Sequence, residues 1–131
     1  MRKLLLSVAV VLALSLVPMM AFAAEIEGTV QGFTCVTQGK VCPVGQEDPI
    51  AAAENVFVVL TATGTYYFVP NVDRAVMARH IAEKVKIVGE MKSGMNAINA
   101  ESLYSYKNGK WQEDWSVEMM KGIEKWLTVQ P

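Results

Sequence analysis

The sequence predicts a single, mostly β domain with five strands, a short helix between the third and the fourth strand, and a helix at the C-terminus. Two observations carry this prediction. Several segments alternate apolar and polar residues with the period of two that half-buried strands show, and the Val-, Phe- and Tyr-rich segment 55–71 is divided by a turn that contains Gly64. Two other segments, residues 73–83 and 116–127, carry apolar residues at helical spacing instead.

Residues 1–23 have the three parts of a secretory signal peptide. Arg2 and Lys3 are followed by a long apolar run and by an Ala-x-Ala sequence that ends at Ala23. The alternative is an uncleaved anchor, because the apolar stretch approaches the roughly 20 residues that span a bilayer. We expect cleavage after Ala23, a periplasmic or secreted protein, and no membrane contact after cleavage.

Residues 24–131 remain as the mature chain, which has the size of one domain. Because Arg2 and Lys3 leave with the signal peptide, 10 of the 12 basic residues remain against 13 acidic residues, a net charge of −3. Binding to nucleic acid rests on clustered Lys and Arg that neutralise phosphates. The composition therefore argues against a nucleic-acid partner.

The first three strands are expected at residues 25–33, 56–60 and 66–69. In the first, apolar and polar residues alternate, and Gly28 marks a bend or a close backbone approach. The second is apolar on both sides, so both of its faces should be covered. The intervening residues 34–53 have little periodicity, and we expect a long ordered loop there with a helical turn near its end.

Asp73 is a suitable N-cap for the short helix that follows the third strand. Strands four and five are expected at residues 84–91 and 96–104, the latter with an extension to Tyr106 left open. The pair Asn108-Gly109 then favours a two-residue type I′ turn, which would place Trp111 on a returning segment.

A C-terminal helix is expected over about residues 116–127, with Ser116 as its N-cap. Its apolar residues recur at helical spacing and form one stripe. Two interpretations are open for the tryptophans at positions 111, 115 and 126: they bury the helix against the sheet, or they leave an apolar surface for a partner or a second copy.

Five strands with a helix between the third and the fourth, and glycines inside the first and the fourth, are the element order of the OB-fold, a Greek-key barrel. Residues 28–30, 85–89 and 96–100 also resemble small secreted bacterial OB-fold proteins of uncharacterised families. The resemblance covers the mature domain to Tyr104 and implies a five-stranded OB-like barrel and an exported location. It implies no activity, and the C-terminal helix lies outside it.

Cys35 and Cys42 are the only two cysteines and have six residues between them. In an exported chain this pair predicts a structural disulfide. The spacing differs from the Cys-x-x-Cys motif of thioredoxin-like proteins and from the haem-binding motif Cys-x-x-Cys-His. Thiolate metal binding and redox sensing at the same pair are the alternatives.

Tyr66, Tyr67 and Phe68 are candidate ligand-binding residues, because OB-folds bind oligosaccharides and oligonucleotides across strands two and three. The alternative is that two of these rings belong to the core. Glu47 and Asp48, in the loop that holds the cysteines, complete the candidate set. Adjacent carboxylates in a loop are more often solvated than catalytic.

His80 is the only histidine, and Met77 lies one helical turn before it. Methionine thioethers suit Cu(I), but methionine is also a common core residue, and no second histidine stands at ligand spacing. We therefore predict no metal site and no cofactor. A solvated His80 beside Arg79 and Glu83 is the simpler interpretation.

No motif joins a nucleophile to a base, and Gly-x-Ser-x-Gly is absent, so we do not predict an enzyme. The leading hypothesis is a small exported binding or accessory module that contacts a small ligand, a glycan or a protein through residues 35–49 and the aromatic strand. One alternative is soft-metal or thiol chemistry at Cys35 and Cys42. Another is a structural protein that forms homo-oligomers through its C-terminal helix.

Overall fold

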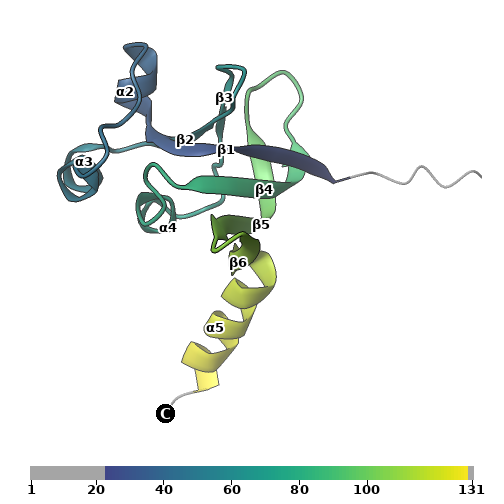
Figure 1. The fold of residues 1–131 in the computed structure, drawn as a ribbon. Helices are drawn as coiled ribbons and strands as arrows, with labels where there is room; N and C mark the ends of the chain where they lie inside the picture. The colour runs from purple at the N-terminus through teal and green to yellow at the C-terminus, as the bar shows by residue number, and fades with distance from the viewer. Residues whose placement is uncertain (1–22, 130–131) are drawn as a thin grey trace, which may run out of the picture.

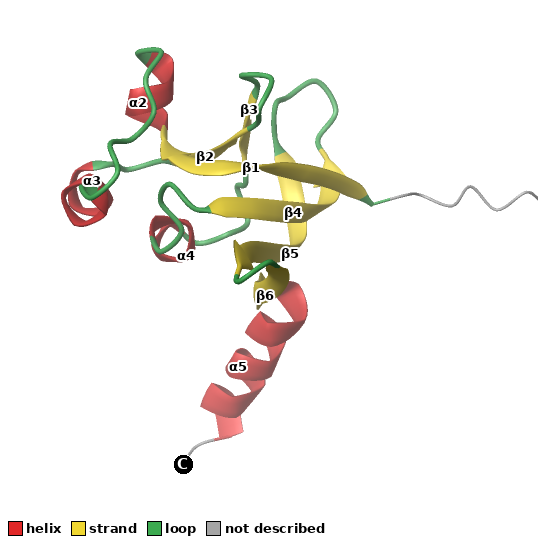
Figure 2. Ribbon diagram, in the orientation of Figure 1, coloured by secondary structure: helices red, strands yellow, loops and turns green. Residues whose placement is uncertain are grey.

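A computed structural model describes residues 23–129, so the predicted signal peptide lies outside the described residues except for Ala23. Six antiparallel strands form one sheet in the order β3-β2-β1-β4-β5-β6, and helices cover its ends (Figures 1 and 2). The elements are β1 (Ala24–Gly32), α2 (Phe33–Thr37), α3 (Glu47–Ala53), β2 (Phe57–Leu60), β3 (Tyr66–Phe68), α4 (Arg74–Ala78), β4 (Lys84–Met91), β5 (Ile98–Lys107), β6 (Lys110–Ser116) and α5 (Val117–Val129).

The predicted class, mostly β with a C-terminal helix, is confirmed, but the predicted count of five strands is wrong, and the six strands form an open sheet that does not close into a barrel. The returning segment after Asn108-Gly109 is a full strand, β6, which pairs with β5 and ends the open sheet. Asn108 and Gly109 both have positive φ, as the type I′ turn requires. The strand count was too low because the turn was recognised while the strand beyond it was not.

The far edge of the sheet, β3, approaches the start of β5 without forming a ladder with it. The Phe68 amide donates to the Asn96 carbonyl at 2.9 Å, and one isolated parallel bridge joins Phe68 to Ala97. Just beyond, the Asn71 side chain exchanges two hydrogen bonds with the backbone of Ala100, at 2.7 and 2.8 Å. A side chain therefore replaces the strand pairing that would close the sheet.

Two glycines allow strands to pack too closely for any side chain. A Cβ on Gly28 would lie 2.4 Å from the Leu60 carbonyl oxygen, and one on Gly89 would lie 2.1 Å from that of Asn99. The pairing of β4 with β5 is irregular between Val88 and Gly89. The close backbone approach at Gly28 is one of the two outcomes expected for the first strand, whereas the one at Gly89 was not predicted.

The hairpin of β2 and β3 is confirmed, and its first strand is covered on both faces. Phe57, Val58 and Val59 are all buried. Val59 belongs to the main core cluster, whereas Val58, which is 0% exposed, points to the other side and is covered there. This burial explains the apolar residues at consecutive positions.

Both predicted helix caps form. The Asp73 carboxylate accepts from the Ala75 amide at 2.7 Å at the start of α4, and the Ser116 hydroxyl accepts from the Met119 amide at 3.3 Å at the start of α5. The expected loop over residues 34–53 is wrong in part, since it contains α2 as well as α3. Only the helical turn near its end was anticipated.

Helix α5 extends away from the sheet, as Figures 1 and 2 show. Trp115, just before it, is 6% exposed in the core, whereas Trp126 near its far end is 61% exposed. Each of the two interpretations of the tryptophans therefore applies to a different residue. Trp115 holds the start of the helix against the core, whereas Trp126 lies in solvent.

We expect Gly89→Ala to destabilise the protein by about 1–3 kcal/mol, because the added methyl group would overlap the Asn99 carbonyl and force the strands apart. Gly122→Ala is the control: a Cβ there meets open space in α5, and alanine favours a helix over glycine. Urea denaturation of both variants measures the difference. Equal stability of the two would contradict the close-packing argument.

Candidate functional site

One face of the sheet packs on the core, and we name it the inner face. The side chains at the alternate positions of each strand point to the opposite side, which we name the outer face. Cross-strand pairs put side chains on the same side of a sheet. Ile26 pairs with the buried Ile87, and both belong to the inner face. Thr29, three residues later in β1, belongs to the outer face and pairs with both Leu60 and Lys84. By this register the outer face carries Glu27, Thr29 and Gln31 of β1, Val58 and Leu60 of β2, Tyr66 and Phe68 of β3, Lys84 and Lys86 of β4, Tyr104 and Tyr106 of β5, and Trp111 of β6.

At one end of the outer face, Phe33, Tyr66 and Phe68 form an aromatic cluster. The Phe33 ring lies 5.8 Å from that of Tyr66 and 5.3 Å from that of Phe68, and the latter two are 5.8 Å apart in an edge-to-face arrangement. All three residues are half-buried. Tyr67 points to the opposite face and packs against the core. Two of the three predicted rings, Tyr66 and Phe68, therefore lie in one cluster. Phe33, the third member of the cluster, was not predicted.

A cavity of about 350 Å³ lies on the outer face, between the β1–β4 pair and the end of β2, and none of the three rings lines it. Leu60 lines it and pairs with Tyr66 in the hairpin. The polar lining consists of the Thr29 and Thr61 hydroxyls and of Glu27 and Lys84, whose side chains form an ion pair at 3.5 Å. The cavity thus places hydroxyl, carboxylate and ammonium groups on the same face as the aromatic rings.

At the other end of the outer face, two lysines alternate with aromatic rings. The Lys84 ammonium lies 5.2 Å from the Tyr106 ring centre and 5.3 Å from that of Trp111. The Lys86 ammonium lies 5.2 Å from Tyr104 and 4.9 Å from Trp111. Such cation–π contacts fix both the lysines and the rings. The sequence pattern that could have predicted this group is the spacing of Tyr104 and Tyr106 two residues apart on one strand, with Trp111 after the Asn108-Gly109 turn.

The two cysteines lie close together but are not bonded. Their sulfur atoms are 3.4 Å apart, against about 2.05 Å in a disulfide, and both thiols are free in this structure. Cys42 is buried, and Cys35 is half-buried on α2. The predicted disulfide therefore stays a prediction, and the fold already holds its two sulfurs in proximity.

The backbone around Cys42 is fixed to β1. Its amide donates to the Gln31 side-chain oxygen at 2.5 Å, and its sulfur accepts from the Gly32 amide at 3.1 Å. Burial raises the pKa of the Cys42 thiol, which outweighs the lowering effect of the Gly32 hydrogen bond. Because the thiolate is the reactive and metal-binding form, this environment favours a structural role over soft-metal or redox chemistry.

Glu54 attaches α2 to the start of β2. Its carboxylate accepts from the Thr34 amide at 3.0 Å, from the Thr34 hydroxyl at 3.2 Å and from the Asn55 amide at 3.1 Å. Burial alone would raise the pKa of Glu54, but hydrogen bonds from Thr34, Val56 and Asn55 outweigh it and lower that pKa. The carboxylate therefore positions the segment that carries Cys35.

The acidic candidates have local roles at the start of α3. The Glu47 carboxylate accepts from the Gly45 amide at 2.9 Å, a hydrogen bond that lowers the pKa of Glu47. Asp48 is exposed in the same helical turn. Within residues 23–129, neither side chain bonds to the aromatic cluster, so the structure separates them from Tyr66 and Phe68.

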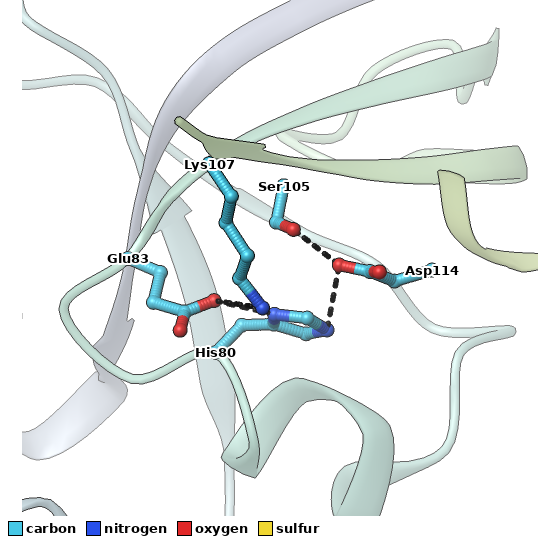
Figure 3. Close-up of polar contacts among 5 residues, drawn as sticks. All are labelled: His80, Glu83, Ser105, Lys107 and Asp114. Atoms are coloured by element: carbon cyan, nitrogen blue, oxygen red, sulfur yellow. Dashed lines mark hydrogen bonds and ion pairs between the residues drawn. The ribbon is translucent and has the colours of Figure 1, made fainter. Parts of the chain in front are cut away.

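His80 is 5% exposed, so its interpretation as a solvated residue is wrong. Figure 3 shows its ring between two carboxylates: Nδ1 lies 2.8 Å from Glu83 Oε2, and Nε2 lies 3.9 Å from Asp114 Oδ2. The Lys107 ammonium lies 3.7 Å from Glu83, and the Ser105 hydroxyl donates to Asp114. These contacts join the turn after α4 to β5 and β6.

This polar cluster does not have the geometry of a nucleophilic triad. The fully buried Ser105 hydroxyl bonds to the carboxylate of Asp114 and not to the imidazole of His80, so no base faces it. In the described part of the chain, every buried side-chain polar atom has a hydrogen-bond partner. The cluster forms the polar side of a cavity of about 490 Å³, here named the α4–α5 pocket, whose other walls are largely apolar.

Within residues 23–129, no group of three or more His, Cys, Asp or Glu side chains is arranged to hold a metal ion. Among the described helices, none has the length and apolar character needed to cross a membrane. Comparisons of this chain with protein-family models, with curated proteins and with solved structures give no match. The outer face and the α4–α5 pocket are therefore interpreted from their own chemistry.

The cysteine pair leads to a test of the disulfide. We expect oxidised glutathione to close it by exchange: the two thiols lose two hydrogens and two electrons to the glutathione disulfide, which is released as two molecules of reduced glutathione. Closure of so short a loop should raise the free energy of unfolding by about 2.5 kcal/mol in the chain-entropy model. Mass spectrometry and denaturation with and without reductant measure both effects. Unaltered mass after oxidation would contradict the prediction.

Glu54→Gln should lower stability at neutral pH by about 1 kcal/mol, because it removes a charged acceptor. The folded-state pKa lies below the unfolded value of about 4.3. The stabilisation is therefore complete above that pH and is lost as the pH falls through the folded pKa. Denaturation curves at several pH values should show wild type and variant converging in acid. The exposed Glu90→Gln is the control, and a difference that persists in acid would contradict this role.

Proposed function

We propose that this protein is a small exported module that binds a glycan on the outer face of its sheet. The observation that carries the proposal is the arrangement of two aromatic groups on one face, with a cavity on the same face whose mostly apolar lining includes the polar side chains of Glu27, Thr29 and Lys84. Sugar rings present C–H groups that pack on aromatic side chains and hydroxyls that need hydrogen-bond partners. The outer face offers both chemistries side by side.

The topology supports the same location for the site. We interpret the open sheet as an OB-like arrangement to which β6 and α5 are added, and the strand order β3-β2-β1-β4-β5 and the approach of Phe68 to Ala97 support this interpretation. OB-folds bind oligosaccharides and oligonucleotides over strands two and three, between the β1–β2 and β4–β5 loops. Here those loops are residues 33–56 and 92–97, and the Phe33, Tyr66 and Phe68 cluster lies next to both.

The charges of the outer face favour a glycan over a nucleic acid. Lys84 and Lys86 are its cations within the described residues, and they pair with Glu27 at 3.5 Å and Glu25 at 3.8 Å. Neutralised lysines do not form the basic surface that phosphate binding requires. Sugar hydroxyls, by contrast, bond equally well to a carboxylate and to an ammonium group.

A binding role also agrees with the polar groups that the fold buries. Asp114 accepts from the Ser105 hydroxyl and lies 3.9 Å from His80 Nε2, an arrangement that leaves the serine hydroxyl without contact to the imidazole. The alternative of soft-metal or thiol chemistry is disfavoured by the buried Cys42, whose thiol resists deprotonation. The export signal predicted for residues 1–23 would place the module where glycans of the cell surface are accessible.

Titration with soluble oligosaccharides, neutral and anionic, tests this proposal by NMR chemical shifts and calorimetry. We expect shifts to concentrate on β1–β6 outer-face residues and on the cavity at Thr29. Tyr66→Ala and Trp111→Ala should each weaken binding at least about tenfold, which corresponds to 1.4 kcal/mol. Each variant loses a ring that is half-buried, so the fold should persist.

Val129→Ala is the matched control, because Val129 is an exposed apolar residue on α5 far from the outer face. Its affinity should equal that of wild type. The proposal fails if no oligosaccharide of the panel binds at saturating concentration, or if the ring variants and the control bind equally well.

A further inference from the structure

Helix α5 carries an apolar stripe that the described part of the chain leaves exposed. Met119, Met120, Ile123, Trp126 and Leu127 recur at spacings of three and four residues and so lie on one side of the helix. Each is at least 39% exposed. The charged residues of α5 lie on the opposite side: Glu118, Lys121, Glu124 and Lys125. We name the five apolar residues the α5 stripe.

The two halves of the α5 stripe differ in their surroundings. Met119, Met120 and Ile123 line the α4–α5 pocket, together with Val76 and the buried Trp115. Trp126, by contrast, lies seven residues beyond Met119, or about 10 Å along the helix, where α5 extends away from the sheet (Figure 1). One helix thus has an apolar recess near its beginning and a large exposed ring near its end.

We propose that two copies of the protein pair through antiparallel α5 helices, with Trp126 of each copy seated in the α4–α5 pocket of the other. Antiparallel pairing brings the end of one helix against the beginning of its partner. A two-fold axis then forms both contacts at once and closes the assembly as a dimer. The pocket, at about 490 Å³, has room for an indole and part of Leu127.

The charges complement this arrangement. The last turn of α5 has no basic residue, so the partial negative charge of its carbonyl end is not compensated within the helix. Arg79 and Lys107 line the pocket into which that end would dock. Arg79 forms no ion pair within residues 23–129, and it is therefore available to the partner helix.

The same charges argue against a lipid surface as the occupant. Helices that lie on anionic membranes have a polar side rich in Lys and Arg. The polar side of α5 carries two acidic and two basic residues, and Lys121 lies 4.0 Å from Glu118 within the same helix. A neutral polar side and a narrow apolar stripe are typical of helices that pair with other helices.

Analytical ultracentrifugation of the purified mature protein over a concentration series tests the proposal. We expect a monomer–dimer equilibrium. Trp126→Glu should raise the dissociation constant at least about tenfold, since a large ring in a central pocket is a typical hot spot. Lys121→Glu, a substitution on the exposed charged side of α5 opposite the stripe, should leave the constant unchanged. Circular dichroism verifies that both variants keep the helix.

A second variant distinguishes two modes of dimerisation: docking of Trp126 into the α4–α5 pocket of the other copy, and contact between the α5 stripes of the two copies without the pocket. Val76→Trp lies on α4, fills the α4–α5 pocket with its own ring and leaves the α5 stripe intact. We expect it to weaken dimerisation as strongly as Trp126→Glu. Arg79→Glu, on the exposed rim, should weaken it as well and needs no repacking.

Three outcomes would overturn the inference. The first is a wild-type protein that stays monomeric across the whole concentration series. The second is a dimer that Val76→Trp and Arg79→Glu leave as strong as in wild type, because the pocket would then have no part in it. The third is binding of the monomer to neutral or anionic lipid vesicles that Trp126→Glu abolishes, which would identify a membrane as the occupant of the stripe.

Discussion

The close approach at Gly28 is the constraint on which the rest of the structure depends. Strand β1 pairs with β4 over its first six residues and with β2 over its last four, and Thr29 takes part in both pairings. A side chain at position 28 would meet the Leu60 carbonyl, so only glycine lets β2 and β4 share this strand. Without that sharing, the hairpin of β2 and β3 and the strands β4 to β6 would not belong to one sheet.

One consequence is a separation of chemistry between the two faces. Residues whose side chains point to the same side of the sheet as Thr29 place aromatic rings and paired charges on the outer face. Positions one residue away in register, such as Ser105 and Trp115, point inward to the core and the α4–α5 pocket. Because a shift of one residue exchanges the faces, the close approach at Gly28 and the bulge at Gly89 also determine which residues can form a binding surface.

Local patterns predicted the parts of the fold that local physics determines: the hairpin at Gly64, the caps at Asp73 and Ser116, and the close backbone approach at Gly28. Features that depend on distant pairing were missed. Phe33 joins the aromatic cluster because β2 pairs with both β1 and β3, and His80 is buried where the turn after α4 meets Asp114 of β6. The expected barrel is open because β3 reaches β5 through only one isolated bridge and the Asn71 side chain, contacts between residues far apart in the sequence.

The two proposed surfaces are compatible because they lie on different sides of the sheet. Trp111 and Tyr106 point outward, whereas Trp115, three pairs further along the β5–β6 ladder and beyond its irregularity, points to the pocket beneath α5. A dimer formed through α5 would therefore leave both outer faces free. Two glycan sites held in one assembly bind a repetitive polymer with an effective concentration that a single weak site lacks. Loss of the dimer should then reduce retention on a polymeric glycan while leaving the affinity for a short oligosaccharide unchanged.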